Sequence, residues 1–357
     1  MHYVSVDNLK PGMVLGQEIY DAEGKTLIMA EAPLTEENIG FLSFLGILGV
    51  YINDEAGKDV KSGGIVNTRV RKDAVSVVTK FFNRAKGDAI KEKYGVEVSR
   101  EEEDIQNSVS QVVNEVLSDE QVMNTIIEVR TYDGYTFFHS ADVAILAGVI
   151  GEKCHLKDTE IRDLVTAGFL HDVGKVFIDP DIINAPRRLT DEEREKMMAH
   201  PDKGFEYLRV NFSFNENVLR AVHEHHEWYN GGGYPSKKGG NALAFISRVL
   251  KCADVYDAMT GRRVYHEPYL PGEVMEYFMG RSGMEFDPSI VKTMSRTLCV
   301  YPAGCDIELS DGRRGIVVEN HAGAVLRPTV FIPETGESVD LLHDRDTMNL
   351  TITKLAI

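Results

Sequence analysis

Residues 164–175 of this chain read LVTAGFLHDVGK. Leu164, Val165 and Gly168 keep the spacing of one helix face, and His171 and Asp172 follow directly on the same segment. An apolar helix face normally points into a protein core, where an unpaired imidazolium or carboxylate costs several kcal/mol. The stretch therefore predicts a core helix that delivers two ionisable side chains to a partner inside the fold.

Further histidines lie on both sides of this pair. Seven of the chain's 11 histidines fall within residues 139–226. Five of these histidines and Asp254 are separated by 32, 29, 25, 1 and 28 positions. Each of the four long gaps gives room for one helix that leads away and one that returns. Such spacing can return every side chain to one point and is typical of a metal site. The residues are His139, His171, His200, His225, His226 and Asp254.

The positions of these residues on their helices support the same interpretation. In the segment 216–228, apolar stripes lead to the adjacent His225 and His226, which indicates that both imidazoles point into the core. Asp254 continues a stripe of four-residue steps that begins at Ile246. A shared metal ion would supply the partner that these buried groups need.

The ligand types and their number indicate two metal ions. Imidazole nitrogen and carboxylate oxygen suit iron, manganese, zinc or nickel better than calcium. Five histidines and two aspartates are more than one four- to six-coordinate ion needs, and His171 and Asp172 diverge by about 100° on a helix. Two such ions can hold a bridging hydroxide for phosphoester cleavage. Lys175, one helical turn beyond His171, would offset charge on a phosphate oxygen, unless it is an ordinary surface lysine.

Other catalytic motifs are absent from the sequence. The stretch His223-Glu224-His225-His226-Glu227 contains no HExxH motif, because Glu227 stands where the second histidine is required. There is no GxxxxGK[ST] loop for a nucleotide and no GxSxG serine nucleophile. Hydrolysis that depends on metal ions is therefore favoured over these alternatives.

Composition excludes several classes of protein. The 357 residues, 43% hydrophobic and 27% charged, are typical of a globular protein of two or three domains. A net charge of −17 argues against a DNA or RNA partner. No signal peptide or membrane span is recognised, and the four cysteines form no CxxC pair, so we expect a cytoplasmic protein with reduced thiols.

The hydrophobic pattern predicts a mainly α fold of four segments. Residues 1–56 read as a small α/β unit whose helix opens after Thr35, and residues 57–128 as a linker and a helical segment. Residues 129–300 form the central all-helical bundle, in which Thr190 and Glu193 predict a capping box for the helix that carries His200. Residues 301–357 read as a small β-rich module. One apolar helix face is expected from Ile105, Val109, Val112, Val113, Val116 and Leu117.

Two motifs identify a family. His171-Asp172-Val173-Gly174-Lys175 resembles the HDxGK motif of the HD superfamily of metal-dependent phosphohydrolases. His225-His226-Glu227, Gly231 and Gly233-Tyr234-Pro235 resemble the HHExxxGxGYP motif of its HD-GYP branch. The resemblance covers roughly Val129 to Pro288 and implies an HD-type bundle that hydrolyses cyclic di-GMP, a bacterial second messenger, to pGpG and in many members to GMP.

The resemblance also implies roles for single residues. Asp172 and Lys175 would be catalytic, and Lys175 would contact the scissile phosphate. The implied metal ligands are His139, His171, Asp172, His200, His225, His226 and Asp254. The implied substrate contacts are Asp133, Lys175, Tyr234, Arg263 and His266.

The sequence departs from the family pattern at three places. Members with three metal ions carry a glutamate four residues before the first histidine, where this chain has Tyr135, so we predict two ions. His266 replaces a basic residue that often follows Arg-Pro-Tyr, which would weaken one phosphate contact or make it depend on pH. Ala185-Pro186-Arg187 replaces a common Lys-Pro-Gly. None of these changes removes a proposed ligand.

The sequence therefore predicts a cytoplasmic bacterial cyclic di-GMP phosphodiesterase with two divalent ions, most readily iron or manganese. The partner is expected to be cyclic di-GMP or a related cyclic dinucleotide, with no DNA, RNA or membrane, and a homodimer is compatible with the sequence. A receptor that binds cyclic di-GMP or pGpG with little turnover, or a hydrolase of another cyclic dinucleotide, remain alternatives. The N-terminal unit is assigned a regulatory or dimerisation role from its position alone.

Overall fold

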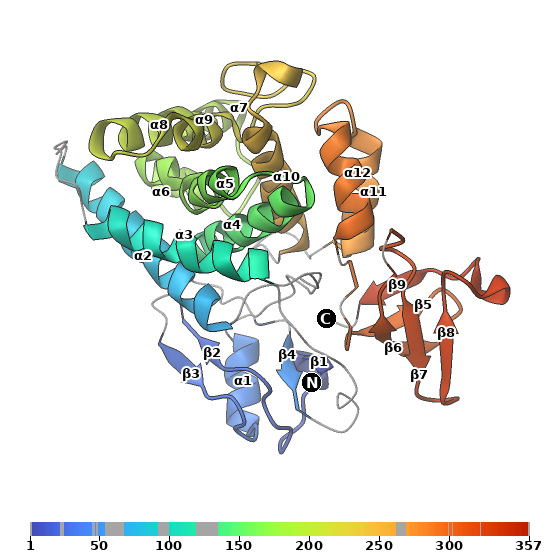
Figure 1. Cartoon of the computed structure of the whole chain (residues 1–357). Helices are drawn as coiled ribbons and strands as arrows, with labels where there is room; N and C mark the ends of the chain where they lie inside the picture. Colours follow the sequence, from blue (N-terminus) through green and yellow to red (C-terminus); the bar gives the residue numbers. More distant parts are fainter. Residues whose placement is uncertain are drawn as a thin grey trace.

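The chain is described by a computed structural model in which helices dominate and small β units lie at both ends (Figure 1). The predicted mainly α class, with a central all-helical bundle, a small N-terminal α/β unit and a C-terminal β module, is confirmed. The predicted boundaries between the four segments stay predictions. The structure describes residues 2–21, 25–44, 47, 49–53, 68–91, 100–118, 135–261, 269–298, 300–301, 303–321 and 323–355.

The N-terminal unit has its own apolar core, which includes the buried Leu15, Leu42 and Ile52. Its elements are β1 (His2–Ser5), β2 (Ile19–Tyr20), β3 (Thr26–Ile28), α1 (Glu36–Phe44) and β4 (Gly49–Ile52). β1 pairs antiparallel with β4, and β2 with β3. The predicted start of the helix is confirmed, because the Thr35 hydroxyl accepts a hydrogen bond from the Asn38 N–H at 3.1 Å.

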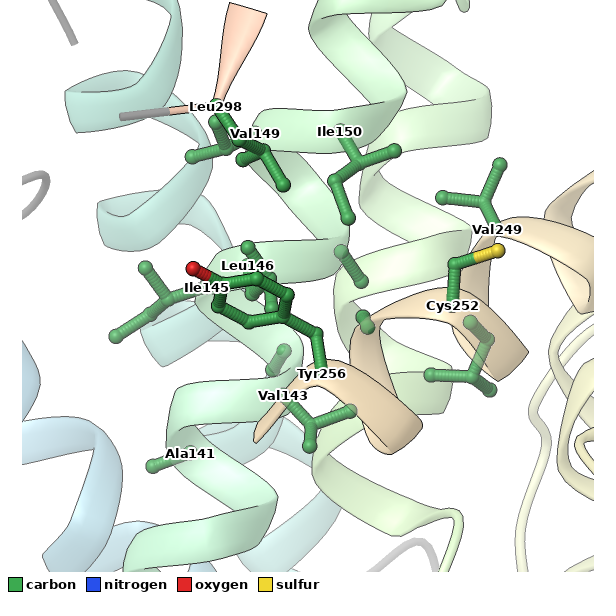
Figure 2. Close-up of a cluster of buried hydrophobic side chains, with 14 of the residues drawn as sticks. Ala141, Val143, Ile145, Leu146, Val149, Ile150, Val249, Cys252, Tyr256 and Leu298 are labelled. Atoms are coloured by element: carbon green, nitrogen blue, oxygen red, sulfur yellow. The ribbon is translucent and has the colours of Figure 1, made fainter. Parts of the chain in front are cut away.

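The bundle is built around α4 and α5. Its helices are α2 (Thr68–Lys91), α3 (Arg100–Ser118), α4 (Tyr135–Lys153), α5 (Asp158–Leu170), α6 (Pro180–Ile183), α7 (Asp191–Met197), α8 (His200–Asn211), α9 (Glu216–Glu224), α10 (Phe245–Thr260), α11 (Pro271–Arg281) and α12 (Pro288–Thr297). α5 packs against α3, α4, α9 and α10. Figure 2 shows Leu146 and Ile150 of α4 in one buried cluster with Val249, Cys252 and Tyr256 of α10. The two helices that carry the first and last predicted ligands therefore share one core.

Three local predictions were wrong. α9 ends at Glu224, so His225 and His226 lie in the turn beyond the helix. The capping box of Thr190 and Glu193 is present, but it opens α7, and His200 is instead the first residue of α8. On α3, Leu117 is 40% exposed, whereas the other members of the predicted apolar face are buried.

The C-terminal module is a five-stranded antiparallel sheet in the order β8-β7-β6-β5-β9. Its strands are β5 (Asp306–Leu309), β6 (Arg314–Glu319), β7 (Thr329–Ile332), β8 (Glu337–Asp340) and β9 (Ile352–Leu355). The predicted β-rich character of this module is confirmed. The edge strand β8 has no strand pattern in the sequence, because Val339 is its sole apolar residue.

No helix in the described part of the chain combines the length and the apolar character that a bilayer crossing requires. Cys154 and Cys252 are free thiols, as expected. The cytoplasmic location and the homodimer stay predictions.

The close contact between α4 and α5 makes Gly168 sensitive to substitution. A Cβ atom added there would lie 2.5 Å from the Cα atom of Ala144. We expect Gly168→Ala to lower the free energy of unfolding by about 1–3 kcal/mol, because overpacking forces the helices apart. Urea denaturation measures this change.

Gly87 of α2 is the matched control, since an added Cβ atom there meets nothing within 4 Å. Gly87→Ala should leave stability unchanged or raise it by up to about 1 kcal/mol, because alanine is the better helix former. Equal effects of the two substitutions would contradict the proposed close packing.

Candidate metal centre

The seven predicted metal ligands come together inside the bundle. They arrive from α4 (His139), the end of α5 (His171, Asp172), the start of α8 (His200), the turn after α9 (His225, His226) and α10 (Asp254). Two groups of three have their ligand atoms within 4.8 Å of one another, namely His139 with His171 and Asp254, and His200 with His225 and His226. The convergence inferred from the spacing is present in the fold.

Asp172 lies between the two groups. Its Oδ1 atom is 3.5 Å from Nε2 of His200 in one group. Its Oδ2 atom is 3.4 Å from Nε2 of His171 and 3.8 Å from Nε2 of His139 in the other. The carboxylate is 1% exposed. Asp172 is therefore placed to contact ions in both groups.

Backbone carbonyl groups orient three of the imidazoles. The Nδ1 atoms of His171, His200 and His225 each face the carbonyl oxygen three residues earlier, at 2.8, 2.8 and 2.6 Å. A carbonyl oxygen can only accept, so each Nδ1 atom carries a proton, and the neutral form of each ring has its lone pair at Nε2. This arrangement prepares metal-binding histidines.

His139 is oriented by the carboxylate of Asp257, a residue to which the sequence pattern gave no role. Its Nδ1 atom is 2.6 Å from Oδ2 of Asp257, which is fully buried, while its Nε2 atom is 3.2 Å from Oδ1 of Asp254. Asp254 and Asp257 are three residues apart on α10 and so share a face. That spacing was the signal from which Asp257 could have been found.

The ring nitrogens of this centre are better suited to binding metal ions than to hydrogen bonding with one another. His171 Nε2 is buried without a hydrogen-bond partner. The Nε2 atoms of His200 and His225 lie 3.2 Å apart, and their protonated Nδ1 atoms leave a lone pair on each. Two facing lone pairs repel each other unless a cation lies between them. The buried, unsatisfied nitrogens are therefore suited to a shared ion.

The protonation states also suit cation binding. Burial lowers the pKa of His200 to about 4 and keeps the pKa of His225 and His226 well below the usual range, so these imidazoles are neutral at pH 7. Burial alone would raise the pKa of Asp172 and Asp254. The nearby Lys175 and His171 for Asp172, and His139 and His171 for Asp254, outweigh it and hold both pKa values well below normal.

The segment around Tyr234 covers one side of the centre. The Tyr234 ring stacks on His226, with ring centroids 4.8 Å apart and an interplanar angle of 22°. Glu227 holds the segment through Oε1, which accepts a hydrogen bond from the Ser236 N–H at 2.6 Å. A Cβ atom on Gly233 would meet the backbone of residues 226–228, so only glycine fits this packing. The GYP residues thus place an aromatic ring against His226, a predicted metal ligand.

Lys175 lies at the edge of the buried centre. It belongs to a 3₁₀ turn (Val173–Phe177), is 30% exposed, and its Nζ atom donates to Asp172 Oδ2 at 2.5 Å. It is therefore not an ordinary surface lysine. His223 takes no part, because its Nε2 atom pairs with the exposed Asp202 at 2.8 Å. Asp133, Arg263 and His266, and the side chain of Tyr135, lie outside the described residues.

Comparison with known proteins identifies the family. Residues 111–290, half of the chain, match the HD domain family. The chain belongs to the HD domain family. The solved structure of Bd1817, a HDG"Y"P protein from Bdellovibrio bacteriovorus, matches 82% of this chain and 97% of its own length, with a TM-score of 0.50 and 13% identity. This likeness supports the HD fold.

Curated relatives are cyclic dinucleotide phosphodiesterases. The cyclic di-GMP phosphodiesterase PA4108 of Pseudomonas aeruginosa is 27% identical over 77% of this chain and 63% of its own length. The cyclic di-GMP phosphodiesterase response regulator RpfG of Xanthomonas campestris is 33% identical over 46% and 44%. The 3'3'-cGAMP-specific phosphodiesterase 2 of Vibrio cholerae is 30% identical over 50% and 34%. The chain thus spans less than two thirds of these relatives.

The contact between Asp257 and His139 gives a testable role to Asp257. Asp257→Asn removes the charge that orients the ring, so we expect metal affinity to fall about 10- to 100-fold. Metal content measured after dialysis against graded concentrations of a chelator reports this change.

Asp202→Asn is the matched control, because Asp202 also contacts a histidine ring but lies outside the centre. It should leave metal content unchanged. If Asp257→Asn retains metal as firmly as Asp202→Asn does, the orienting role of Asp257 is wrong.

Proposed function

We propose that this chain is a phosphodiesterase that hydrolyses cyclic di-GMP to pGpG, and onward to GMP, at a centre of two divalent metal ions. The observation that carries the proposal is the convergence of five imidazoles and two carboxylates in the bundle core, where Nε2 of His171 is buried without a hydrogen-bond partner. Membership of the HD domain family and the named activities of the relatives support it.

The two three-residue groups would each hold one ion, with Asp172 between them. Iron or manganese suits this mixture of imidazole and carboxylate. When bound, two such ions supply Lewis acidity and a water nucleophile that is active near neutral pH. The protein's own contribution is to exclude bulk water from the ligands, since six of the seven ligands are less than 10% exposed.

The remaining side chains would bind the substrate. The Nζ atom of Lys175 is partly exposed beside Asp172, within reach of a phosphate oxygen, and its charge would offset the charge that develops there during cleavage. Tyr234, stacked on His226, would pack against the nucleotide. Contacts by Asp133, Arg263 and His266 stay predictions from the family resemblance.

A second candidate substrate is 3'3'-cGAMP. Three relatives are named as 3'3'-cGAMP-specific phosphodiesterases, at 30%, 26% and 29% identity. Both dinucleotides present the same phosphodiester chemistry to the metal ions and differ in one base. Competing substrates in one assay would rank them.

The central test removes the shared ligands. We expect His171→Ala with Asp172→Ala to abolish both metal content and hydrolysis of cyclic di-GMP, because the pair contributes to both ion groups. Protein purified without oxygen and loaded with iron or manganese is assayed for pGpG and GMP. Tight binding of cyclic di-GMP by the metal-loaded wild type without product formation would instead select the receptor alternative.

A substitution of Lys175 distinguishes an effect on catalysis from an effect on metal binding. Lys175→Met should lower kcat roughly 100-fold or more while the metal content is retained, because a charge that stabilises the transition state is lost. Lys203→Met is the control, since Lys203 is an exposed lysine that donates to the Phe177 carbonyl. Equal activity of the two variants would rule out a phosphate contact by Lys175.

A further inference from the structure

A second group of potential metal ligands lies in the C-terminal sheet, outside the matched HD domain. His321 follows β6, Asp340 ends β8, and His343 lies in the turn after β8. Nε2 of His321 is 3.0 Å from Oδ1 of Asp340, and Nδ1 of His343 is 2.8 Å from its Oδ2. One ligand atom from each residue lies within 4.8 Å of the others.

Backbone N–H groups fix the orientation of the Asp340 carboxylate. Oδ1 accepts hydrogen bonds from the N–H groups of Leu342 and His343, at 2.9 and 3.1 Å. Burial alone would raise the pKa of Asp340. The His343 hydrogen bond and the two N–H groups outweigh it and hold the pKa well below the usual range. The carboxylate is thus ionised and fixed in orientation, as in metal sites with supporting hydrogen bonds.

We propose that His321, Asp340 and His343 form a separate site for a divalent transition metal such as Zn²⁺. Two imidazoles and one carboxylate select borderline metals over Mg²⁺ and Ca²⁺, which prefer oxygen ligands alone. The hydroxyl of Thr329, whose Oγ1 atom is 3.1 Å from His321 Nε2, adds an oxygen atom at the edge of the group.

The geometry needs only a small adjustment to bind one ion. Zinc lies about 2.0–2.2 Å from nitrogen and oxygen ligands, so two of its ligands can be at most about 4.4 Å apart. The contacts of the two rings with Asp340, at 3.0 and 2.8 Å, are within this limit, and His343, which is 68% exposed, has more room to adjust than His321, which is 15% exposed. Exposure of His343 leaves the other coordination positions to water.

Such an ion would tie two parts of the sheet together. His321 belongs to the connection from β6 to β7, whereas Asp340 and His343 belong to the end of β8, the edge strand. A metal link between them would stabilise this edge of the module. The site shares no residue with the HD centre, so this proposal stands whether or not the proposed phosphodiesterase activity is correct.

Equilibrium dialysis of the 357-residue chain against Zn²⁺ tests the proposal. His343→Ala and Asp340→Asn should each bind one Zn²⁺ ion fewer per chain than the wild type, or bind it at least tenfold more weakly. Asp340→Asn keeps an acceptor for both backbone N–H groups, so it keeps the turn folded if His343→Ala does not. Activity on cyclic di-GMP should be unchanged in both.

His155→Asn is the matched control. It removes another exposed imidazole, at a position with a φ of 59°, which asparagine tolerates. This variant should bind as much Zn²⁺ as the wild type. If His343→Ala and Asp340→Asn also match the wild type, the three residues form a hydrogen-bonded cluster alone and the proposal is wrong.

Discussion

Burial of ionised and lone-pair groups at one point is the constraint on which the rest of the structure depends. Asp172 is 1% exposed and Asp254 7%, and both are surrounded by apolar helices. Desolvation of such charges costs several kcal/mol each unless a partner compensates it. Lys175 and the histidines compensate part of this cost, while Nε2 of His171 is buried without a hydrogen-bond partner. A bound cation would offset more of the cost, so metal binding at this centre would also stabilise the bundle.

The positions of the ligands follow from this constraint. His171 and His225 lie just after α5 and α9, where the last four carbonyl groups of a helix lack helical partners. These carbonyls accept the Nδ1 protons of the two rings, so one hydrogen bond satisfies the helix end and fixes the ligand. A histidine inside a helix would find its neighbouring carbonyls already occupied. Helix ends therefore provide the free carbonyl groups that orient these two histidines.

The sequence predicts which side chains converge better than it predicts the path of the chain that carries them. Spacing and apolar stripes identify which side chains enter the core, because burial is periodic along a helix. Where a helix ends depends on distant contacts. The chain just after α9 is held by hydrogen bonds from the N–H groups of Tyr229 and Asn230 to the carbonyls of Glu285 and Met284, which are 56 and 54 residues away. No local pattern encodes these bonds, so the helix was predicted to run past His226.

The N-terminal unit shares contacts with the helix that carries His139. Asp142, one turn beyond His139 on α4, accepts hydrogen bonds from Nε and Nη2 of Arg71 on α2, at 2.7 and 3.0 Å. Nη1 of Arg71 is 3.3 Å from the Tyr20 hydroxyl of β2, and Tyr20 stacks on Phe138, the neighbour of His139. Breaking a buried ion pair leaves an uncompensated charge, at a cost of about 3–5 kcal/mol. The position of α4, and with it one metal ligand, is therefore set together with the packing of the N-terminal unit.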